Sequence, residues 1–467
     1  MHPYKTRIRP DFPGRFHSQQ RKLRQLTLIL VQHIKALFQH PFIRNVLTVA
    51  SGTALSQIVA IAFSPLLTRL YGPEAFGLQG IFLSAGGLAA TIAAMGYPTA
   101  IVLPKNDADA KLIVLLSIFI GLTTSLLIAA TLILWGDGIL ALLNAKEIAG
   151  FMFLIPFAML FSVFSAVLGQ WLIRKKAYKL SARYGVLSTV LLNSIKTCLG
   201  FIQPTAFVLI ATNTFGSALY PALAYLGWTK EEKCVAGTQL KSSSRRKTVA
   251  KLLRLAKRYR DFPILRTPQN LINSLSQALP MLLLASFFGP ASAGHYGIAL
   301  AVLGIPASLI GSSVMSVFYP KVTESINNKE DARSLIVRAT IGMAATGAFP
   351  FVVILFAGPF LFALIFGAEW RNAGIYAQIL SPWLFLQFIN KPAVSAIPSL
   401  GLQGGLLVYE LFSTGTKIFA LWVGFSVFKS DTAAIGIFSL VGIIAYLWLI
   451  LWVITRSRNL PISDNGY

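Results

Sequence analysis

Twelve long apolar runs constrain the fold of this chain more than any other feature of its sequence. One α-helix needs about 20 mostly apolar residues to cross a bilayer core about 30 Å thick. Runs of that length cover residues 46–70, 77–97, 112–135, 150–171, 184–203, 205–228, 267–288, 294–319, 339–366, 374–397, 404–428 and 432–455. Charged residues make up 12% of the chain, against roughly 25% in soluble domains. The sequence therefore predicts an all-α polytopic membrane protein with about twelve transmembrane helices. Pro350 and Gly358-Pro359 predict that the ninth run bends or ends early.

Basic residues give the expected orientation of these helices in the membrane. The formal net charge is +25, with 41 lysines and arginines against 16 acidic residues. If the N-terminus is cytoplasmic, 34 of the 41 basic residues fall on cytoplasmic segments, 4 on outer segments and 3 inside the runs. Short cytoplasmic segments of membrane proteins are enriched in lysine and arginine. We therefore expect an inner-membrane protein with both termini in the cytoplasm, and the charge surplus does not indicate nucleic acid.

The basic residues also divide the chain into expected regions. Leucines and isoleucines recur at helical spacing in residues 21–40 beside lysine and arginine, which is typical of an interfacial helix. A basic tail without fixed structure explains the same segment equally well. The expected regions are a cytoplasmic N-terminal segment (1–45), an N-lobe (46–228), a basic cytoplasmic linker (229–263), a C-lobe (264–456) and a cytoplasmic tail (457–467).

The two lobes share a sequence pattern. The first run contains Leu-Ser-Gln at 55–57 and ends in Gly72-Pro73, followed by Gly77. The seventh contains Leu-Ser-Gln at 275–277 and ends in Gly289-Pro290, followed by Gly294. The order and the spacing of both elements agree, and both runs cross in the same direction. This indicates a parallel repeat, a known transporter design in which the substrate site lies between the halves.

Polar side chains inside the runs indicate which helix faces meet a cavity. Arg266, Asn270, Asn273 and Gln277 follow one another at steps of four, three and four, so they form one polar stripe on the seventh helix. Gln57 belongs to a polar face of the first helix, which ends at Arg69. Serines and threonines commonly hydrogen-bond between helices, but amides in a stripe favour a wet cavity, since they suit sugar hydroxyls.

Four ionisable residues lie well inside the runs. Lys391 and Glu410 are about equally far from the turn between their helices, so they are expected at the same depth. A structural ion pair and a proton- or sodium-coupling role for Glu410 are both open interpretations. Lys196 and Lys417 have no evident carboxylate partner, although Lys196 also fits a lysine that extends toward the interface. Three lysines against one glutamate favour an anionic substrate over a cationic one.

Known catalytic and metal-binding motifs do not occur in the chain. There is no P-loop, no His-Glu-x-x-His, no Gly-x-Ser-x-Gly, no metal-type cluster and no recognisable cofactor site. The longest outer segment covers residues 136–149, which is short for an enzyme that encloses a sugar substrate. A glycan polymerase or ligase is therefore a weaker interpretation than a transporter.

Several motifs in order resemble one transporter family. They are SPLLTRLYGPEAFG (64–77), AIVLPKNDADA (100–110), WLIRKK (171–176), YRDFP (259–263), FFGPASAGHY (287–296) and FGAEWRNAGIYAQILSPW (366–383). Together they resemble the polysaccharide-export flippases of the multidrug/oligosaccharidyl-lipid/polysaccharide superfamily, which include the O-antigen flippases. Many relatives read Arg-Tyr-Glu where this chain has Gly96-Tyr97-Pro98, so no role of that Arg and Glu is transferred.

The resemblance implies two six-helix lobes around a cavity that opens alternately to either side. It also implies a substrate, undecaprenyl-pyrophosphate-linked oligosaccharide, which moves to the outer leaflet for O-antigen, capsule or exopolysaccharide assembly, with a polymerase or export complex as partner. Our hypothesis from helical phase is that Lys417, Arg266 and Lys196 attract the pyrophosphate, while Asn270, Asn273, Gln277 and Gln57 contact the glycan and the prenyl tail stays in membrane lipid. Arg69 is a further candidate. A multidrug antiporter of the same superfamily is the alternative, and a coupling ion, H⁺ or Na⁺, is not specified.

Overall fold

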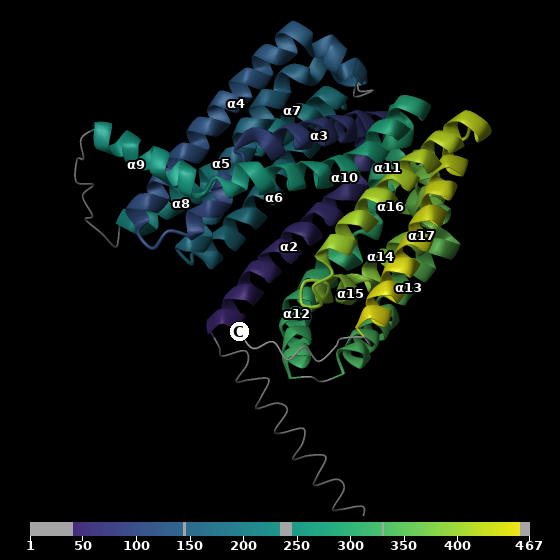
Figure 1. Ribbon diagram of the computed structural model, residues 1–467. Coiled ribbons are helices and arrows are strands. Elements are labelled where there is room, and N and C mark those ends of the chain that lie inside the picture. Colours follow the sequence, from purple (N-terminus) through teal and green to yellow (C-terminus); the bar gives the residue numbers. More distant parts are fainter. Residues whose placement is uncertain (1–40, 143–145, 234–244, 329–330, 458–467) are drawn as a thin grey trace, which may run out of the picture.

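The computed structural model describes residues 41–142, 146–233, 245–328 and 331–457, and every regular element in these ranges is a helix (Figure 1). Ten helical segments in this part of the chain are long and apolar enough to cross a membrane. The expected interfacial helix at 21–40 and the tail after residue 457 lie outside the described residues.

The N-lobe consists of seven helices that make up the first six expected spans. They are α2 (Pro41–Leu70), α3 (Pro73–Ala93), α4 (Asp107–Leu142), α5 (Ile155–Arg174), α6 (Tyr178–Ile202), α7 (Ala206–Gly216) and α8 (Leu219–Lys233). Short 3₁₀ helices precede α4 (η1, Tyr97–Val102) and α5 (η2, Lys146–Leu154). The helical path of α4 kinks at Trp135, where the backbone leaves helical angles, at the expected end of the third span.

The C-lobe consists of α10 (Thr267–Phe288), α11 (Pro290–Leu303), α12 (Ser312–Asn327), α13 (Ala332–Phe366), α14 (Arg371–Ile389), α15 (Lys391–Ala396), α16 (Gln403–Val423) and α17 (Asp431–Arg456). Two expected spans are built from pairs of shorter helices. A π-helical turn at Ala307–Gly311 lies between α11 and α12, and α15 follows α14 after one residue, with Pro392 as its second residue. A proline near a helix start is tolerated because it lacks only an N–H that would have no partner there.

The expectation that the ninth span ends early is wrong, because α13 continues through Pro350 and Pro359 to Phe366. Pro359 has no N–H to donate to the Leu355 carbonyl one turn earlier. The side-chain amide of Gln378 on α14 donates to that carbonyl instead, at 2.8 Å. Gly358 and Gly374 bring the two helices close enough for this bond, since a Cβ at either would overlap the other chain segment. A neighbouring helix thus satisfies the group that the proline leaves free.

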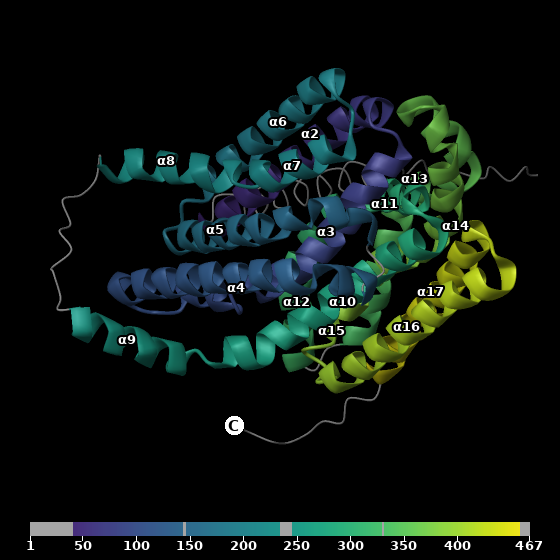
Figure 2. The same cartoon turned by 90° about the horizontal axis from the view of Figure 1, so that it is seen from above.

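The two lobes meet where α3 and α11 cross, and they spread apart toward the start of α2 and toward α12 (Figure 1). Seen from above, α4 and α5 run across the N-lobe, and α8 lies on the side away from α14, α16 and α17 (Figure 2). Each lobe has its own apolar core, and Ala278 and Leu282 of α10 belong to the N-lobe core. The first helix of the C-lobe therefore packs on the N-lobe.

The linker between the lobes contains a helix, α9 (Arg245–Arg258), which sequence reasoning had left within a basic segment. Leu255 is buried in the N-lobe core, Lys251 pairs with Asp109 at 2.5 Å, and the Tyr97 hydroxyl donates to the Ala256 carbonyl at 3.2 Å. The apolar residues at 252, 255, 256 and 259 have the helical spacing that would have revealed this element.

Candidate functional site

The repeated glycine-proline motifs of the two lobes pack directly against each other. A Cβ on Gly77 of α3 would overlap the backbone carbonyl of Pro290, and a Cβ on Gly294 of α11 would overlap the backbone carbonyl of Pro73. The contact is reciprocal, as expected of two copies related by an approximate twofold axis. The close approach of two helix backbones requires glycine at both positions.

The same end of the molecule carries further contacts between the lobes. Arg69 donates to the Leu364 carbonyl at 2.8 Å, and the Thr68 hydroxyl donates to the Phe366 carbonyl at 3.2 Å. The indole N–H of Trp370 donates to the Thr68 carbonyl at 2.9 Å, and the ring of Phe76 packs edge-on against that indole. We call these contacts, together with the glycine contact, the closed end. Arg69 is thus engaged in closing the lobes.

A cavity of about 530 Å³ lies next to the closed end, between α3, α10 and α11. Its polar lining comes from Gln79 and Ser84 of α3 and from Ser274 and Gln277 of α10. We call it the inter-lobe pocket. Its volume is within the range of small-molecule sites. The Met281 side chain, which lines it, lies against Gly80 and Gly297.

The polar stripe of α10 includes Gln277 of this pocket. The Gln277 amide donates to the Asn273 side-chain oxygen at 2.5 Å, so these two predicted residues are brought together. Asn270, Asn273 and Gln277 are exposed on one face of a continuous helix, and Arg266 is exposed in the π-helical turn (Phe262–Arg266) that precedes it. Ile272 and Leu275 are exposed on the opposite face, which is the one suited to lipid.

On its two flanks, α10 contacts both lobes through hydroxyl pairs. Ser274 lies 3.0 Å from Thr91 of α3, between the oxygens, and Ser276 lies 3.2 Å from Thr414 of α16. The stripe lies between these two flanks. Gln277 of the stripe lines the inter-lobe pocket, so the stripe is on the side of α10 that faces the space between the lobes.

Lys417 lies one turn after Thr414 on α16, and its ammonium group lies between two aromatic rings. The Nζ atom is 4.9 Å from the ring centre of Trp383 and 5.3 Å from that of Tyr446. Gln387 fixes Tyr446 by donating to its hydroxyl at 3.0 Å. Aromatic faces attract a cation but carry no net charge. The rings therefore orient the ammonium group without neutralising it.

The expected ion pair between Lys391 and Glu410 is not formed. The three ion pairs within the described residues involve Asp107 and Asp109 only. Lys391 is the first residue of α15 and is half-buried, whereas Glu410 is exposed on α16. Lys391 and Glu410 were expected at the same depth in the membrane. Lys391, however, belongs to the separate short helix α15, which comes before the turn to α16, and equal depth alone does not bring the two side chains together.

The two remaining predicted residues belong to the N-lobe. Lys196 is buried at 9% exposure on α6, where its backbone carbonyl accepts a hydrogen bond of 2.8 Å from Tyr71. Gln57 is exposed on α2, away from the face that Gly52 packs against α6. Within the described residues, no hydrogen bond or ion pair joins the side chain of Gln57 or Lys196 to the α10 stripe.

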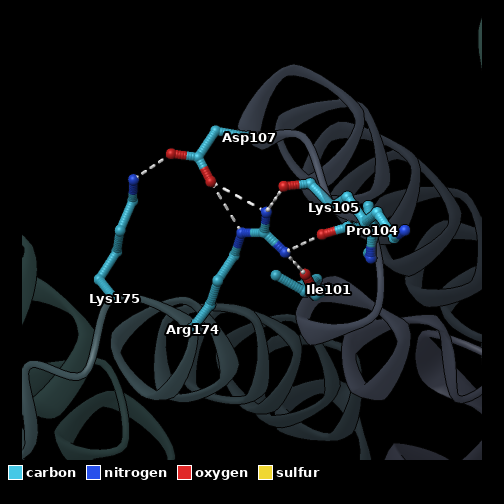
Figure 3. A network of polar contacts seen from close by, with 6 residues as sticks. All are labelled: Ile101, Pro104, Lys105, Asp107, Arg174 and Lys175. Atoms are coloured by element: carbon cyan, nitrogen blue, oxygen red, sulfur yellow. Dashed lines mark hydrogen bonds and ion pairs between the residues drawn. The ribbon is translucent and has the colours of Figure 1, made fainter.

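Two of the sequence motifs form a polar network at the start of α4 (Figure 3). Arg174 donates to Asp107 at 3.0 Å, and to the carbonyls of Ile101 and Pro104 at 3.1 and 2.7 Å. Lys175 also pairs with Asp107. The planar guanidinium group presents five N–H donors in a fixed fork, a geometry that the three donors of a lysine ammonium do not reproduce. The network fixes η1 to the end of α5.

Replacing Arg174 with alanine should destabilise the N-lobe by about 2–3 kcal/mol, since charged hydrogen bonds of about 1.5–3 kcal/mol are lost and carbonyls are left without donors. Arg174→Lys should recover only part of that loss. Thermal unfolding in detergent measures both, with Lys179→Ala as the control for loss of a nearby positive charge. Equal stability of Arg174→Ala and Lys179→Ala would contradict the structural role.

Sequence reasoning missed three residues of this region. Trp383 and Tyr446 around Lys417 are aromatic residues in apolar runs, where nothing in their spacing distinguishes them from core residues, and Trp370 at the closed end lies in the short segment between two runs. Trp370 and Trp383 do occur within the 366–383 motif. That motif was therefore the sequence signal that could have identified these two tryptophans.

Two helical lobes with a pseudo-symmetric contact and a polar space between them define a polytopic membrane transporter. The family described as "Polysaccharide biosynthesis protein" matches residues 66–374, so the chain belongs to that family. It is 22% identical over 348 residues to the succinoglycan biosynthesis transport protein ExoT of Rhizobium meliloti (strain 1021), covering 74% of this chain and 66% of that protein. The chain thus spans just under two thirds of this relative.

Solved structures of transporters share the fold of this chain. The lipid II flippase MurJ, in an inward closed conformation, superposes with a TM-score of 0.66 at 14% identity, covering 89% of this chain and 88% of that chain. A multidrug resistance MATE family transporter of the superfamily, in an inward-facing conformation, superposes with a TM-score of 0.60 at 16% identity, covering 88% and 96%. These are transporters, and the chain shares their fold.

Proposed function

We propose that this protein is a flippase that moves undecaprenyl-pyrophosphate-linked oligosaccharide from the cytoplasmic to the outer leaflet of the inner membrane. The prenyl tail stays in lipid while the head group crosses between the lobes. The names of the two relatives that move envelope precursors, a succinoglycan transport protein and a lipid II flippase, support this substrate class.

One observation carries the proposal: the α10 stripe borders the inter-lobe pocket through Gln277, and α10 contacts α16, whose Lys417 forms no ion pair within the described residues. Asn270, Asn273 and Gln277 offer donors and acceptors for sugar hydroxyls. Lys417, held by aromatic rings, keeps its positive charge for a pyrophosphate. Arg266 adds a second cation at the end of the stripe where a head group would enter.

The proposed orientation places the closed end on the outer side and the linker helix α9 in the cytoplasm. It rests on the distribution of lysine and arginine, most of which lie on the segments at the α9 side. The lobes in this structure then open inward. An impermeant maleimide that reached a cysteine at Asn270 only from outside intact cells would contradict this orientation.

The membrane potential can drive the proposed movement. With the inside negative, outward movement of one negative charge is favoured by about 2.3 kcal/mol per 100 mV. A pyrophosphate that crosses without a co-transported cation therefore needs no further energy source. Co-transport of H⁺ or Na⁺ would change this balance, and Glu410 is the carboxylate within the described spans that is proposed for that role.

Competition binding separates the flippase from its alternative, a multidrug antiporter. Purified protein in detergent should bind a labelled polyprenyl-pyrophosphate oligosaccharide, and unlabelled polyprenyl pyrophosphate should displace it, whereas an excess of ethidium should not. The positive interior predicts this preference. Saturable ethidium binding without binding of the pyrophosphate lipid would favour the antiporter.

A further inference from the structure

A second cavity lies within the N-lobe, apart from the space between the lobes. It has a volume of about 600 Å³ and is lined by α4, α5 and α8. None of its lining residues belongs to the C-lobe. The cavity is therefore separate from the transport path that we propose between the lobes.

The lining is apolar over most of its length and polar at one end. Phe161, Phe164, Val167 and Ile118 form apolar walls. At the other end, Lys111 lies in the first turns of α4, and Trp228 and Thr229 lie near the end of α8. Tryptophan and lysine side chains at helix ends are typical of the level of lipid head groups. The cavity has the polarity of an amphiphile with its head at the start of α4.

The polar end of the cavity carries a positive charge, on Lys111, that can bind an anion. Asp107 pairs with Arg174 and Lys175, and Asp109 pairs with Lys251, so the nearby carboxylates on α4 are already engaged. Lys111 is exposed and takes part in none of the three ion pairs within the described residues. Lys175 is also close, because its ammonium lies 5.3 Å from the ring centre of Trp171, which lines the cavity.

The cavity opens sideways, toward the lipid around the N-lobe. Ala222 and Tyr225 of α8 line it and are exposed. In a membrane this opening faces the acyl chains of lipids. An acyl chain can therefore enter the cavity from the leaflet without crossing the protein surface. The volume lies within the range of pockets that bury a ligand of drug size.

We propose that this cavity binds an anionic phospholipid of the leaflet at which α4 begins, with one acyl chain between α5 and α8 and the phosphate beside Lys111. The site is separate from the proposed transport function, and it does not depend on which side of the membrane is cytoplasmic. A bound lipid would join α4 to α8 across the outer surface of α5.

Photo-crosslinking of the full chain in lipid nanodiscs tests the site. Phosphatidylglycerol and phosphatidylcholine, each with a diazirine in the acyl chain, are compared, and crosslinked peptides are mapped by mass spectrometry. Phosphatidylglycerol should label the peptides that contain Phe164 and Tyr225. Ala222→Trp, which fills the opening, should lower this labelling at least fivefold, and Ala218→Leu is the second filling variant if Ala222→Trp does not fold.

A substitution of Lys111 tests the role of its charge separately from the shape of the cavity. Lys111→Ala should lower phosphatidylglycerol labelling about fivefold, the contribution of one lysine near an anionic surface, and should leave phosphatidylcholine labelling unchanged. Lys105→Ala, an exposed lysine outside the cavity, is the matched control and should have no effect. Unchanged labelling in the folded filling variants, or equal loss of both lipids in Lys111→Ala, would overturn the proposal. Stronger labelling by a photoreactive polyprenyl phosphate would overturn the assignment to phospholipid.

Discussion

Replacing Gly77 with alanine should shift the lobes away from the conformation in which the closed end is formed. The added methyl group would overlap the Pro290 carbonyl, which is backbone and cannot rotate away. Overpacking of this kind costs about 1–3 kcal/mol, and 1.4 kcal/mol is a tenfold change in an equilibrium. We therefore expect the open form of this end to gain about fivefold to a hundredfold in population.

Side-specific labelling measures this shift. In a chain with Cys198 and Cys234 replaced by serine, a cysteine at Asn270 should react with an impermeant maleimide from the α9 side. Gly77→Ala should add reaction from the opposite side. Gly87→Ala is the matched control, since it lies on the same helix and a Cβ there meets nothing within 4 Å. If both variants label alike, the glycine contact does not hold the closed end.

The reciprocal geometry predicts how a second substitution behaves. Gly294→Ala should have the same effect as Gly77→Ala, because each methyl group would meet the other lobe's proline carbonyl. The double variant should destabilise the closed end by less free energy than the sum of the two single variants, because both substitutions disrupt one shared contact.

Replacing Lys417 with methionine should lower transport of the pyrophosphate lipid at least tenfold without lowering the stability of the protein. Methionine keeps the length and much of the packing between Trp383 and Tyr446, so the substitution removes mainly the charge. A hydrogen bond to a charged group contributes about 1.5–3 kcal/mol, which corresponds to about ten- to a hundredfold. Transport into reconstituted vesicles at matched protein levels is the measurement.

Two further variants separate charge from packing at this position. Lys417→Ala should transport as poorly as Lys417→Met but unfold at a lower temperature, because it leaves the aromatic rings without a neighbour. Lys429→Ala, an exposed lysine after the end of α16, should transport at the rate of the unchanged protein. Wild-type transport by a folded Lys417→Met variant would remove Lys417 from the substrate path.

The sequence was sufficient for the membrane class, the span pattern and the glycine-proline repeat, because these depend on apolar length and local motif spacing. Helical phase also placed Asn273 and Gln277 together, since i, i+4 positions share a face in any continuous helix. The closed end brings together motifs from α2, α3, α11 and the end of α13. Their order along the chain gave no indication that they would meet.

Features that depend on packing between distant helices could not be predicted. The association of α10 with the N-lobe core is set by the fit of its Ala278 and Leu282 against α3, which no single-helix pattern encodes. The predicted ion pair between Lys391 and Glu410 is wrong because equal depth leaves undetermined how each helix is rotated about its own axis. The continuation of α13 through Pro359 depends on one glutamine of the next helix.

The most direct test of the central claim is leaflet exposure of the substrate in vesicles that contain only the purified protein. Fluorescent polyprenyl-pyrophosphate oligosaccharide is placed in both leaflets, and a glycan-cleaving enzyme added outside removes what it can reach. With folded protein, the cleaved fraction should rise from about half toward completion within minutes, and Lys417→Met vesicles should lag. A cleaved fraction that stays at half with folded protein, for every glycan tried, would contradict the assignment as a flippase.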